Sequence, residues 1–258
     1  DHRDLHSFPT RRSSDLGIRG IKHMTKNSDK KRKEVKEVKE EAQKYPTVKH
    51  SALTLVNNPS VKTHYINGAI DHSTLKDFQS FLNTILDENR KLDDEAAERL
   101  DKQKFKNIHE PDAKPEFVST PKPKVERINL VINSGGGLVA VMLAMVALMK
   151  TSPIPIDTYC FGSAMSAAFF IFLHGKRRYI GPGASFMTHS IGAMAWDNVP
   201  NMAIRMEYLV QQNKYAQEEI AKRTGLTLEW LKEKEHVDIY FSATEALDVK
   251  FGDVLIVD

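Results

Sequence analysis

The sequence has little cysteine and no long apolar segment, and each shortage excludes a class of protein. Its 258 residues contain one cysteine, Cys160, so no disulfide can form within the chain. This usage is typical of a reducing compartment, and we expect a cytoplasmic protein. The longest apolar runs, Leu138–Met149 and Ala164–Leu173, are shorter than the roughly 20 residues that a membrane-spanning helix requires. We therefore expect a globular protein without a membrane partner.

An excess of one charge sign and a nucleotide-binding motif are also missing. The net charge is +3 at pH 7, which does not argue for a nucleic-acid partner. The glycines at 135–137 lie between a strand and a helix, but neither the GxGxxG spacing nor a following GK[ST] is present. His109, Glu110 and Asp112 are the nearest approach to a metal site, and in a proline-rich loop such side chains are more often solvated. We predict no cofactor and no metal.

The N-terminal segment and one internal segment differ in character from the rest. Residues 1–16, DHRDLHSFPTRRSSDL, match a translated sequencing adapter, so we leave them out of the fold and take Met24 as a candidate first residue. Residues 17–50 form a charged arm. Residues 51–258 are the expected folded domain, with a charged, proline-rich insertion at about 89–124 that is partly helical near Asp93–Lys104.

Strand and helix patterns alternate along the folded domain. The strands expected are Ser51–Val56, Thr63–Ile66 with a turn at Asn67–Gly68, Arg127–Asn133, Ile154–Phe161, Arg178–Ile180, Ser185–His189 and Asp253–Val257; the helices expected are Leu75–Leu86, Leu138–Lys150, Ala167–Leu173, Asn201–Thr224, Thr227–Lys234 and a short one ending at Leu247. This order predicts an α/β layer fold with parallel strands and right-handed crossovers. The amphipathic helix Asn201–Thr224 is longer than a small domain's surface requires, which favours contact with another subunit.

The stretch Tyr159–Gly175, YCFGSAMSAAFFIFLHG, indicates a strand, a tight turn of small residues and a buried helix. Ser166 lies where the turn becomes the helix, and free N–H groups there favour a developing anion. A serine on such a turn can act as a nucleophile. It can also be a small residue that permits close helix packing, and the stretch alone favours that second interpretation. A nucleophilic serine also needs a base, and His189, at the end of a short apolar strand, is a candidate that alone would be read as structural.

Four segments together resemble, in order and spacing, the motifs of the Clp protease proteolytic subunit (ClpP) family. They are INSGGGLV at 132–139, GSAMSAA at 162–168, SFMTHS at 185–190 and DIYFSATEALDVKFGDVL at 238–255. The resemblance covers about Val61 to Asp258, apart from the insertion. It implies a ClpP/crotonase-like α/β fold of stacked βαβ units, in which Asn201–Thr224 is a protruding handle helix.

The resemblance also implies a catalytic mechanism, that of a serine endopeptidase. Ser166 would be the nucleophile, His189 the general base and Asp238 the residue that orients the imidazole. His236, in a charged loop, competes with His189 as the base. The oxyanion hole would consist of the Gly136 and Ala167 N–H groups, and an extended peptide would bind beside Gly137, Leu138, Ser190 and Ile191.

The family further implies self-assembly into stacked rings around a closed chamber, fed with unfolded protein by an AAA+ unfoldase that binds the ATP. The chain departs from the family pattern at Gly135, where the family has proline, and at Ala167–Ala168, where it has Met-Gly. These departures and the insertion fit a divergent, phage or prophage branch, so a head-maturation protease of the same fold is an alternative. A catalytically silent ring subunit and a crotonase-type acyl-CoA enzyme are two others. The chain order Ser, His, Asp argues against an α/β-hydrolase.

Overall fold

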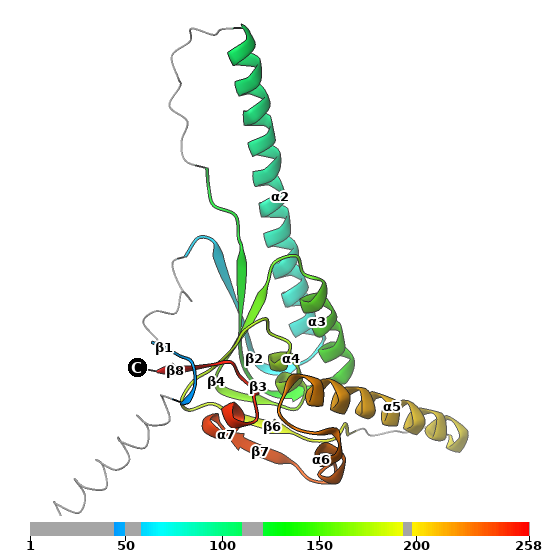
Figure 1. The fold of residues 1–258 in the computed structure, drawn as a ribbon. Helices are drawn as coiled ribbons and strands as arrows, with labels where there is room; N and C mark the ends of the chain where they lie inside the picture. Colours follow the sequence, from blue (N-terminus) through cyan, green and yellow to red (C-terminus); the bar gives the residue numbers. More distant parts are fainter. Residues whose placement is uncertain (1–43, 50–57, 110–120, 193–197, 258) are drawn as a thin grey trace, which may run out of the picture. The chain divides into compact units, whose positions relative to one another are not determined.

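The computed structural model describes residues 44–49, 58–109, 121–192 and 198–257. Residues 1–43, the expected strand at Ser51–Val56 and part of the insertion lie outside these ranges. Tyr45–Asp258 form one compact unit (Figure 1). Its elements are β1 (Thr47–Lys49), β2 (Val61–Ile70), α2 (His72–His109), β3 (Arg127–Gly137), α3 (Val139–Thr151), β4 (Ile156–Met165), α4 (Ala167–Leu173), β5 (Arg178–Ile180), β6 (Ser185–Thr188), α5 (Val199–Arg223), α6 (Leu228–Glu233), β7 (Ile239–Ser242), α7 (Ala243–Asp248) and β8 (Val254–Val257).

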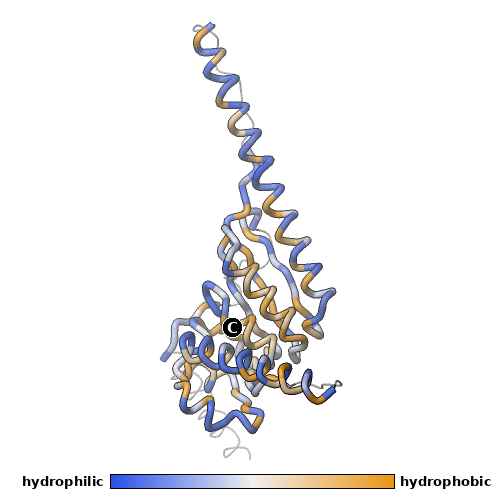
Figure 2. Tube along the Cα trace, turned by 90° about the vertical axis from the view of Figure 1, so that its right-hand side faces the viewer, coloured by the Kyte–Doolittle hydropathy of each residue, from blue (hydrophilic) through white to orange (hydrophobic). Residues whose placement is uncertain are grey.

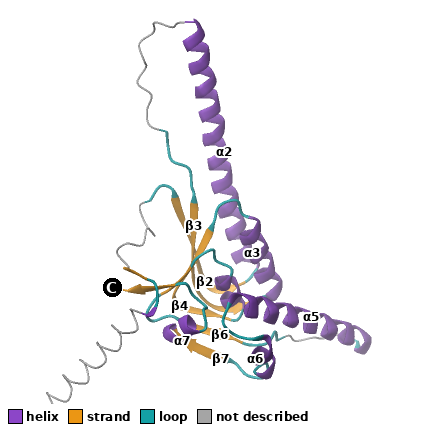
Figure 3. Ribbon diagram, in the orientation of Figure 1, coloured by secondary structure: helices purple, strands orange, loops and turns teal. Residues whose placement is uncertain are grey.

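One sheet organises this unit (Figure 3). Its strand order is β1-β8-β5-β4-β3-β2, and all of these neighbours are parallel. β6 pairs in parallel with the far end of β4, and β7 pairs antiparallel with β6. Parallel strands need crossover connections, which α2, α3 and α4 supply. The predicted α/β fold with parallel strands is confirmed.

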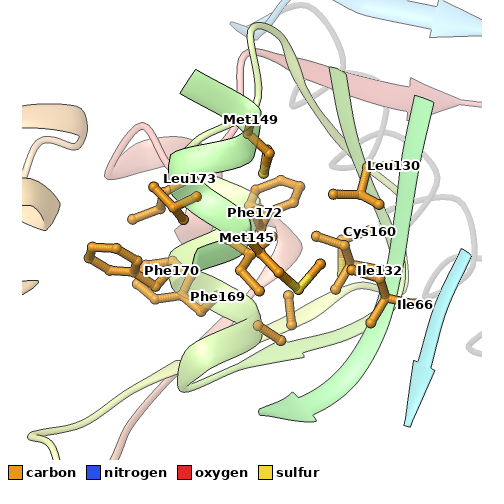
Figure 4. Close-up of a cluster of buried hydrophobic side chains, with 14 of the residues drawn as sticks. Ile66, Leu130, Ile132, Met145, Met149, Cys160, Phe169, Phe170, Phe172 and Leu173 are labelled. Atoms are coloured by element: carbon orange, nitrogen blue, oxygen red, sulfur yellow. The ribbon is translucent and has the colours of Figure 1, made fainter. Parts of the chain in front are cut away.

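The core lies between the sheet and helices α3 and α4. All seven residues of α4 are buried, and α3 adds Met145 and Met149. Figure 4 shows Phe172 of α4 beside Met145, with Leu130 of β3 and Cys160 of β4 on the strand side of the same cluster. Because each buried side chain of this size contributes about 1.5–3 kcal/mol, the packing fixes α4, and with it the residue that precedes α4.

Three strands, β2, β3 and β4, continue past the ends that the sequence indicated. The predicted turn at Asn67–Gly68 is wrong, because β2 continues through it to Ile70 with a bulge opposite β3. Gly68, within this bulge, takes a φ of +101°, a conformation that glycine adopts without strain. β3 likewise continues through the glycines that were expected to form a turn, and β4 continues to Met165.

The boundaries of the insertion and of the N-terminal arm stay predictions, and the structure adds two observations there. The predicted insertion begins at about residue 89, but α2 is continuous from His72 to His109. Its buried residues end at Ile85, and beyond them the helix carries ion pairs at i,i+4 spacing, Glu95–Arg99 and Glu98–Lys102. The distal half of α2 is accordingly mostly hydrophilic (Figure 2). At the other boundary, β1 lies within the expected arm yet pairs with β8.

The long helix α5 is confirmed, with its ends shifted slightly from the predicted Asn201–Thr224. It begins at Val199 because the Asn198 side chain accepts a hydrogen bond from the Asn201 N–H, with a proline in the first turn. Its buried residues are Gln217 and Ile220, both near the C-terminal end. Its exposed large apolar residues are Val199, Met202, Ile204, Met206, Tyr208, Val210 and Tyr215.

Candidate active site

Ser166 lies between the end of β4 and the start of α4 in a strained backbone conformation. Its φ is 52°, which for a residue other than glycine costs on the order of 1–3 kcal/mol. Two backbone hydrogen bonds hold it there. The Ser166 N–H donates to the Met187 carbonyl at 2.8 Å, and the Ser166 carbonyl accepts from the Phe170 N–H at 3.1 Å. The buried helix and strand β6 therefore fix the position of the serine.

The register of strands β4, β6 and β7 brings three distant side chains together. Met165 of β4 pairs with Met187 of β6. Ser166, the residue after Met165, therefore lies next to the end of β6 at Thr188. Thr188 of β6 pairs with Ile239 of β7 in an antiparallel ladder. The next residue along β6 and the preceding residue of β7 are then neighbours, and these are His189 and Asp238.

The side chains of Ser166, His189 and Asp238 make a chain of contacts. His189 Nε2 lies 2.7 Å from Ser166 Oγ, a hydrogen-bond distance. His189 Nδ1 lies 3.5 Å from Asp238 Oδ1, which is within reach of an ion pair but longer than an ordinary hydrogen bond. The His189 and Asp238 side chains are 34% and 54% exposed. The nitrogen that contacts Ser166 thus belongs to His189 and not to His236, and the role of His189 as the base stays a prediction.

The two predicted oxyanion donors lie close to Ser166. Gly136 has a φ of +102°, and a Cβ placed on it would come within 2.8 Å of Ser166 Cβ and 3.1 Å of Ala167 N. Only glycine can therefore occupy that position without displacing the serine turn. In this structure the Gly136 N–H donates to the buried Ser134 Oγ at 3.1 Å, so it must exchange or share that bond to bind an oxyanion.

A pocket of about 160 Å³ opens beside Ser166 and His189. Its apolar wall comes from three helices: Val139 and Met142 of α3, Phe169 and Phe170 of α4, and Ala216 and Ile220 of α5. Gly137 and Ile191, both predicted to bind substrate, also line it. The arrangement can hold an apolar side chain next to the serine hydroxyl.

The other two predicted substrate residues lie elsewhere. Leu138 is 48% exposed and does not line this pocket. Ser190 lines a smaller adjoining cavity, where its hydroxyl donates to the Glu235 carbonyl at 2.7 Å. Gly137 is packed so closely against β2 that a Cβ would lie 2.2 Å from the Ile70 carbonyl oxygen. Substrate binding by Leu138 and Ser190 stays a prediction, and it would use their backbone groups.

Sequence reasoning missed the contribution of α5 to the site. Ala216 and Ile220 line the pocket, and Asn213 Oδ1 accepts a hydrogen bond from the Ile191 N–H at 3.0 Å. Asn213 and Gln217 are polar residues at i,i+4 spacing, but only the structure shows that their face of α5 turns inward. From the sequence, α5 is expected only to contact another subunit.

A polar cluster, buried at His174 and partly exposed at Lys150 and Arg223, joins the ends of α3, α4 and α5. Glu219 of α5 lies 3.1 Å from both Lys150 Nζ and His174 Nε2, and 3.3 Å from Arg223 Nε. Burial alone would raise the pKa of Glu219, but the hydrogen bonds from Lys150, His174 and Arg223 outweigh it and lower the pKa to about 2. Burial lowers the pKa of His174 to about 4. Glu219 is therefore ionised at neutral pH, while His174 is neutral.

The described residues hold no group of three or more His, Cys, Asp or Glu side chains that could bind a metal ion. Of the three residues considered for a metal, His109 ends α2, while Glu110 and Asp112 lie outside the described ranges. Within those ranges, no helix is both long and apolar enough to cross a membrane.

Comparisons with known proteins identify the family of this chain. The ATP-dependent Clp protease proteolytic subunit 1 of Corynebacterium jeikeium is 34% identical over 131 residues, which are 50% of this chain and 70% of that protein. The ATP-dependent Clp protease proteolytic subunit 2 of Corynebacterium efficiens is also 34% identical over 131 residues, which are 50% of this chain and 66% of that protein. A ClpP1 mutant from Listeria monocytogenes shares the fold, with 18% identity, a TM-score of 0.55, and coverage of 76% of this chain and 91% of that one. A family model described as Clp protease matches residues 117–257, and the chain belongs to that family.

Proposed function

We propose that this chain is a serine endopeptidase that hydrolyses peptide bonds with Ser166, His189 and Asp238. The observation that carries the proposal is the 2.7 Å contact between His189 Nε2 and Ser166 Oγ, made by a serine in a strained turn. A serine hydroxyl is a weak nucleophile at neutral pH, and an adjacent base activates it. Membership of the Clp protease family supports a peptidase, and the contact supports the serine type.

In the proposed mechanism, His189 Nε2 takes the Ser166 hydroxyl proton as Oγ attacks the scissile carbonyl. Asp238 stabilises the imidazolium through Nδ1, and His189 then gives the proton to the leaving amine. The Ala167 N–H and the Gly136 N–H, once released from Ser134, bind the tetrahedral oxyanion. The apolar pocket beside Ser166 receives the side chain of the substrate residue whose carbonyl is attacked. Water then releases the acyl group by the same steps.

We further propose that the chain works as a stacked ring of identical subunits. The exposed apolar residues of α5 support this, because so many large apolar side chains exposed on one helix favour contact with another copy. An AAA+ unfoldase that supplies unfolded protein is part of the proposal and rests on the relatives, which are named subunits of ATP-dependent proteases. A cytoplasmic location is consistent with the single, buried cysteine and is proposed on the same basis.

Fluorophosphonate labelling of the recombinant chain, read by peptide mass spectrometry, tests the catalytic proposal. We expect label on Ser166, with Ser166→Ala and His189→Ala both unlabelled. The same sample is examined for its oligomeric state. Assembled protein without label would contradict the peptidase and favour the silent ring subunit.

A further inference from the structure

Two polar contacts hold the segment that follows His189 against the rest of the domain. The Ile191 N–H donates to Asn213 Oδ1 of α5 at 3.0 Å. The Ser190 hydroxyl donates to the Glu235 carbonyl at 2.7 Å. Glu235 is itself tied to α5, since its Oε2 accepts a hydrogen bond from the buried Gln217 at 3.3 Å. The segment at 189–191 is therefore attached to α5 both directly and through the connection between α6 and β7.

The Asn213 contact is the one that acts on the backbone nearest to His189. β6 ends at Thr188, so no sheet hydrogen bond of that strand extends to the next residues. His189 is linked to the sheet on one side only, and the first backbone anchor beyond it is the Ile191 N–H. A change in the backbone two residues away would rotate or displace the imidazole, whose Nε2 must stay within hydrogen-bond reach of Ser166.

We infer that Asn213 is a positioning residue for His189. By accepting the Ile191 N–H, it fixes the segment at 189–191 and keeps the imidazole directed at Ser166 Oγ. Asn213 touches no reacting atom, and its effect passes entirely through the Ile191 backbone. The inference rests on the proposed peptidase function for its kinetic consequence, whereas the anchoring itself is a property of the fold.

The Asn213 contact also occupies one backbone group beside the pocket. The backbone N–H of Ile191 is directed at α5 and bound by Asn213. A peptide in the site cannot use that N–H while the contact holds, and Ile191 contributes to the pocket wall.

The test compares Asn213→Leu, which removes the acceptor, with Asn213→Asp, which keeps an oxygen at the same place. Gln211→Leu is the matched control, because it makes a similar change at an exposed position of the same helix. Two quantities are measured on the assembled full chain: the second-order rate of fluorophosphonate labelling at Ser166, with its pH profile, and amide hydrogen exchange of the peptide that contains Ile191. The oligomeric state is measured for every variant.

We expect Asn213→Leu to lower the labelling rate by roughly tenfold to a hundredfold, the range that a small misplacement of a catalytic group produces. Its Ile191 amide should exchange faster, and the pH profile should change because His189 no longer meets Ser166 in one geometry. Asn213→Asp should restore both the rate and the protection, and Gln211→Leu should match the original chain. A purely structural role for Asn213 would not give rescue by aspartate together with a changed pH profile.

Two results would overturn the inference. One is an Ile191 amide that exchanges equally in the original chain and in Asn213→Leu, which would mean that the anchor is absent. The other is faster exchange with an unchanged labelling rate, which would mean that the anchor does not position His189. If the original chain itself is not labelled, the peptidase proposal fails, and the exchange data still decide whether Asn213 anchors the segment.

Discussion

Helices α4 and α5 adjoin the same pocket but have opposite surroundings. Every residue of α4 is buried, and the helix contains no charged residue. In α5 the buried residues are Gln217 and Ile220, and seven large apolar residues are exposed. The two helices contact each other through Phe170 and Tyr215, whose rings lie 6.4 Å apart, and through His174 and Glu219.

The difference indicates that the two helices have separate tasks. α4 is packed from all sides by this chain alone, so it can fix Ser166 in a strained conformation without help from another subunit. α5 is held at its C-terminal end, where Asn213 and Glu219 make their contacts. Its N-terminal half presents apolar side chains that a second copy could cover. The nucleophile therefore depends on the fold of one chain, whereas the geometry around His189 depends on α5.

The largest expected effect is on stability and comes from truncating one buried side chain of α4. Phe172→Ala removes a fully buried ring that packs 5.0 Å from the Phe186 ring, and we expect a loss of about 3–5 kcal/mol in the free energy of unfolding. Tyr208→Ala removes an exposed aromatic ring from α5 and should cost less than about 0.5 kcal/mol in the isolated chain. Denaturant unfolding at low protein concentration measures both. Similar losses for the two variants would contradict the division of tasks.

The contact between α4 and α5 at His174 predicts a loss of stability in acid. The unfolded imidazole takes up a proton below its ordinary pKa of 6.5, whereas folded His174 resists protonation until about 4, so stability falls as the pH falls through that window. Glu219 adds a loss from about 4.5 toward 2, since its folded pKa is depressed. We expect a loss on the order of 1–3 kcal/mol between about pH 7 and pH 4.5.

The control for this prediction is His174→Gln, measured by denaturant unfolding across the same pH range. His174 Nδ1 lies 2.7 Å from the Phe170 carbonyl and Nε2 lies 3.1 Å from Glu219, so a neutral ring, with one proton, can donate to only one of them. Glutamine does not titrate, and the slope of stability against pH between about 6.5 and 4 should flatten. An unchanged slope would assign the acid loss to other groups.

The sequence predicted which residues come together better than it predicted the strand boundaries. The proximity of Ser166, His189 and Asp238 was predictable because their segments resemble a family whose fold imposes one arrangement, while their catalytic roles stay predictions. The continuation of β2 through Asn67–Gly68 was not predictable from local patterns, since Asn-Gly is a turn signal unless a neighbouring strand extends past it.

The length of α2 was missed for a related reason. The apolar period ends near Leu86, and a helix without a buried face is usually read as a connection. The helix nevertheless continues to His109, and this part carries ion pairs between side chains three or four residues apart. The role of Asn213 required three-dimensional contacts, because its partner lies 22 residues earlier in the chain.

A change on the outer face of α5 should act on assembly and not on folding. Ile204 is 67% exposed, and Ile204→Asp places a charge among the apolar residues that we propose meet another copy. We expect the concentration of half-assembly to rise by roughly tenfold or more, with the free energy of unfolding of the separated chain almost unchanged. Sedimentation velocity measures the first quantity. Gln103→Asp, which adds the same charge at an exposed position of α2, should assemble like the original chain, and equal effects of the two variants would contradict a specific contact at Ile204.

The smallest expected effect lies on the distal part of α2, which resembles α5 in exposure but not in apolar content. Arg99 and Glu95 form an ion pair of 3.5 Å at i,i+4 spacing, and both side chains are about half exposed. Since solvent and salt screen such a pair, Arg99→Ala should change the free energy of unfolding by no more than about 0.5 kcal/mol. Denaturant unfolding in low and high salt measures this change, and raising the salt concentration should diminish it further. A loss of several kcal/mol would show that this part of α2 packs against something in the folded chain, and α2 would then belong with α4 in the comparison of buried and exposed helices.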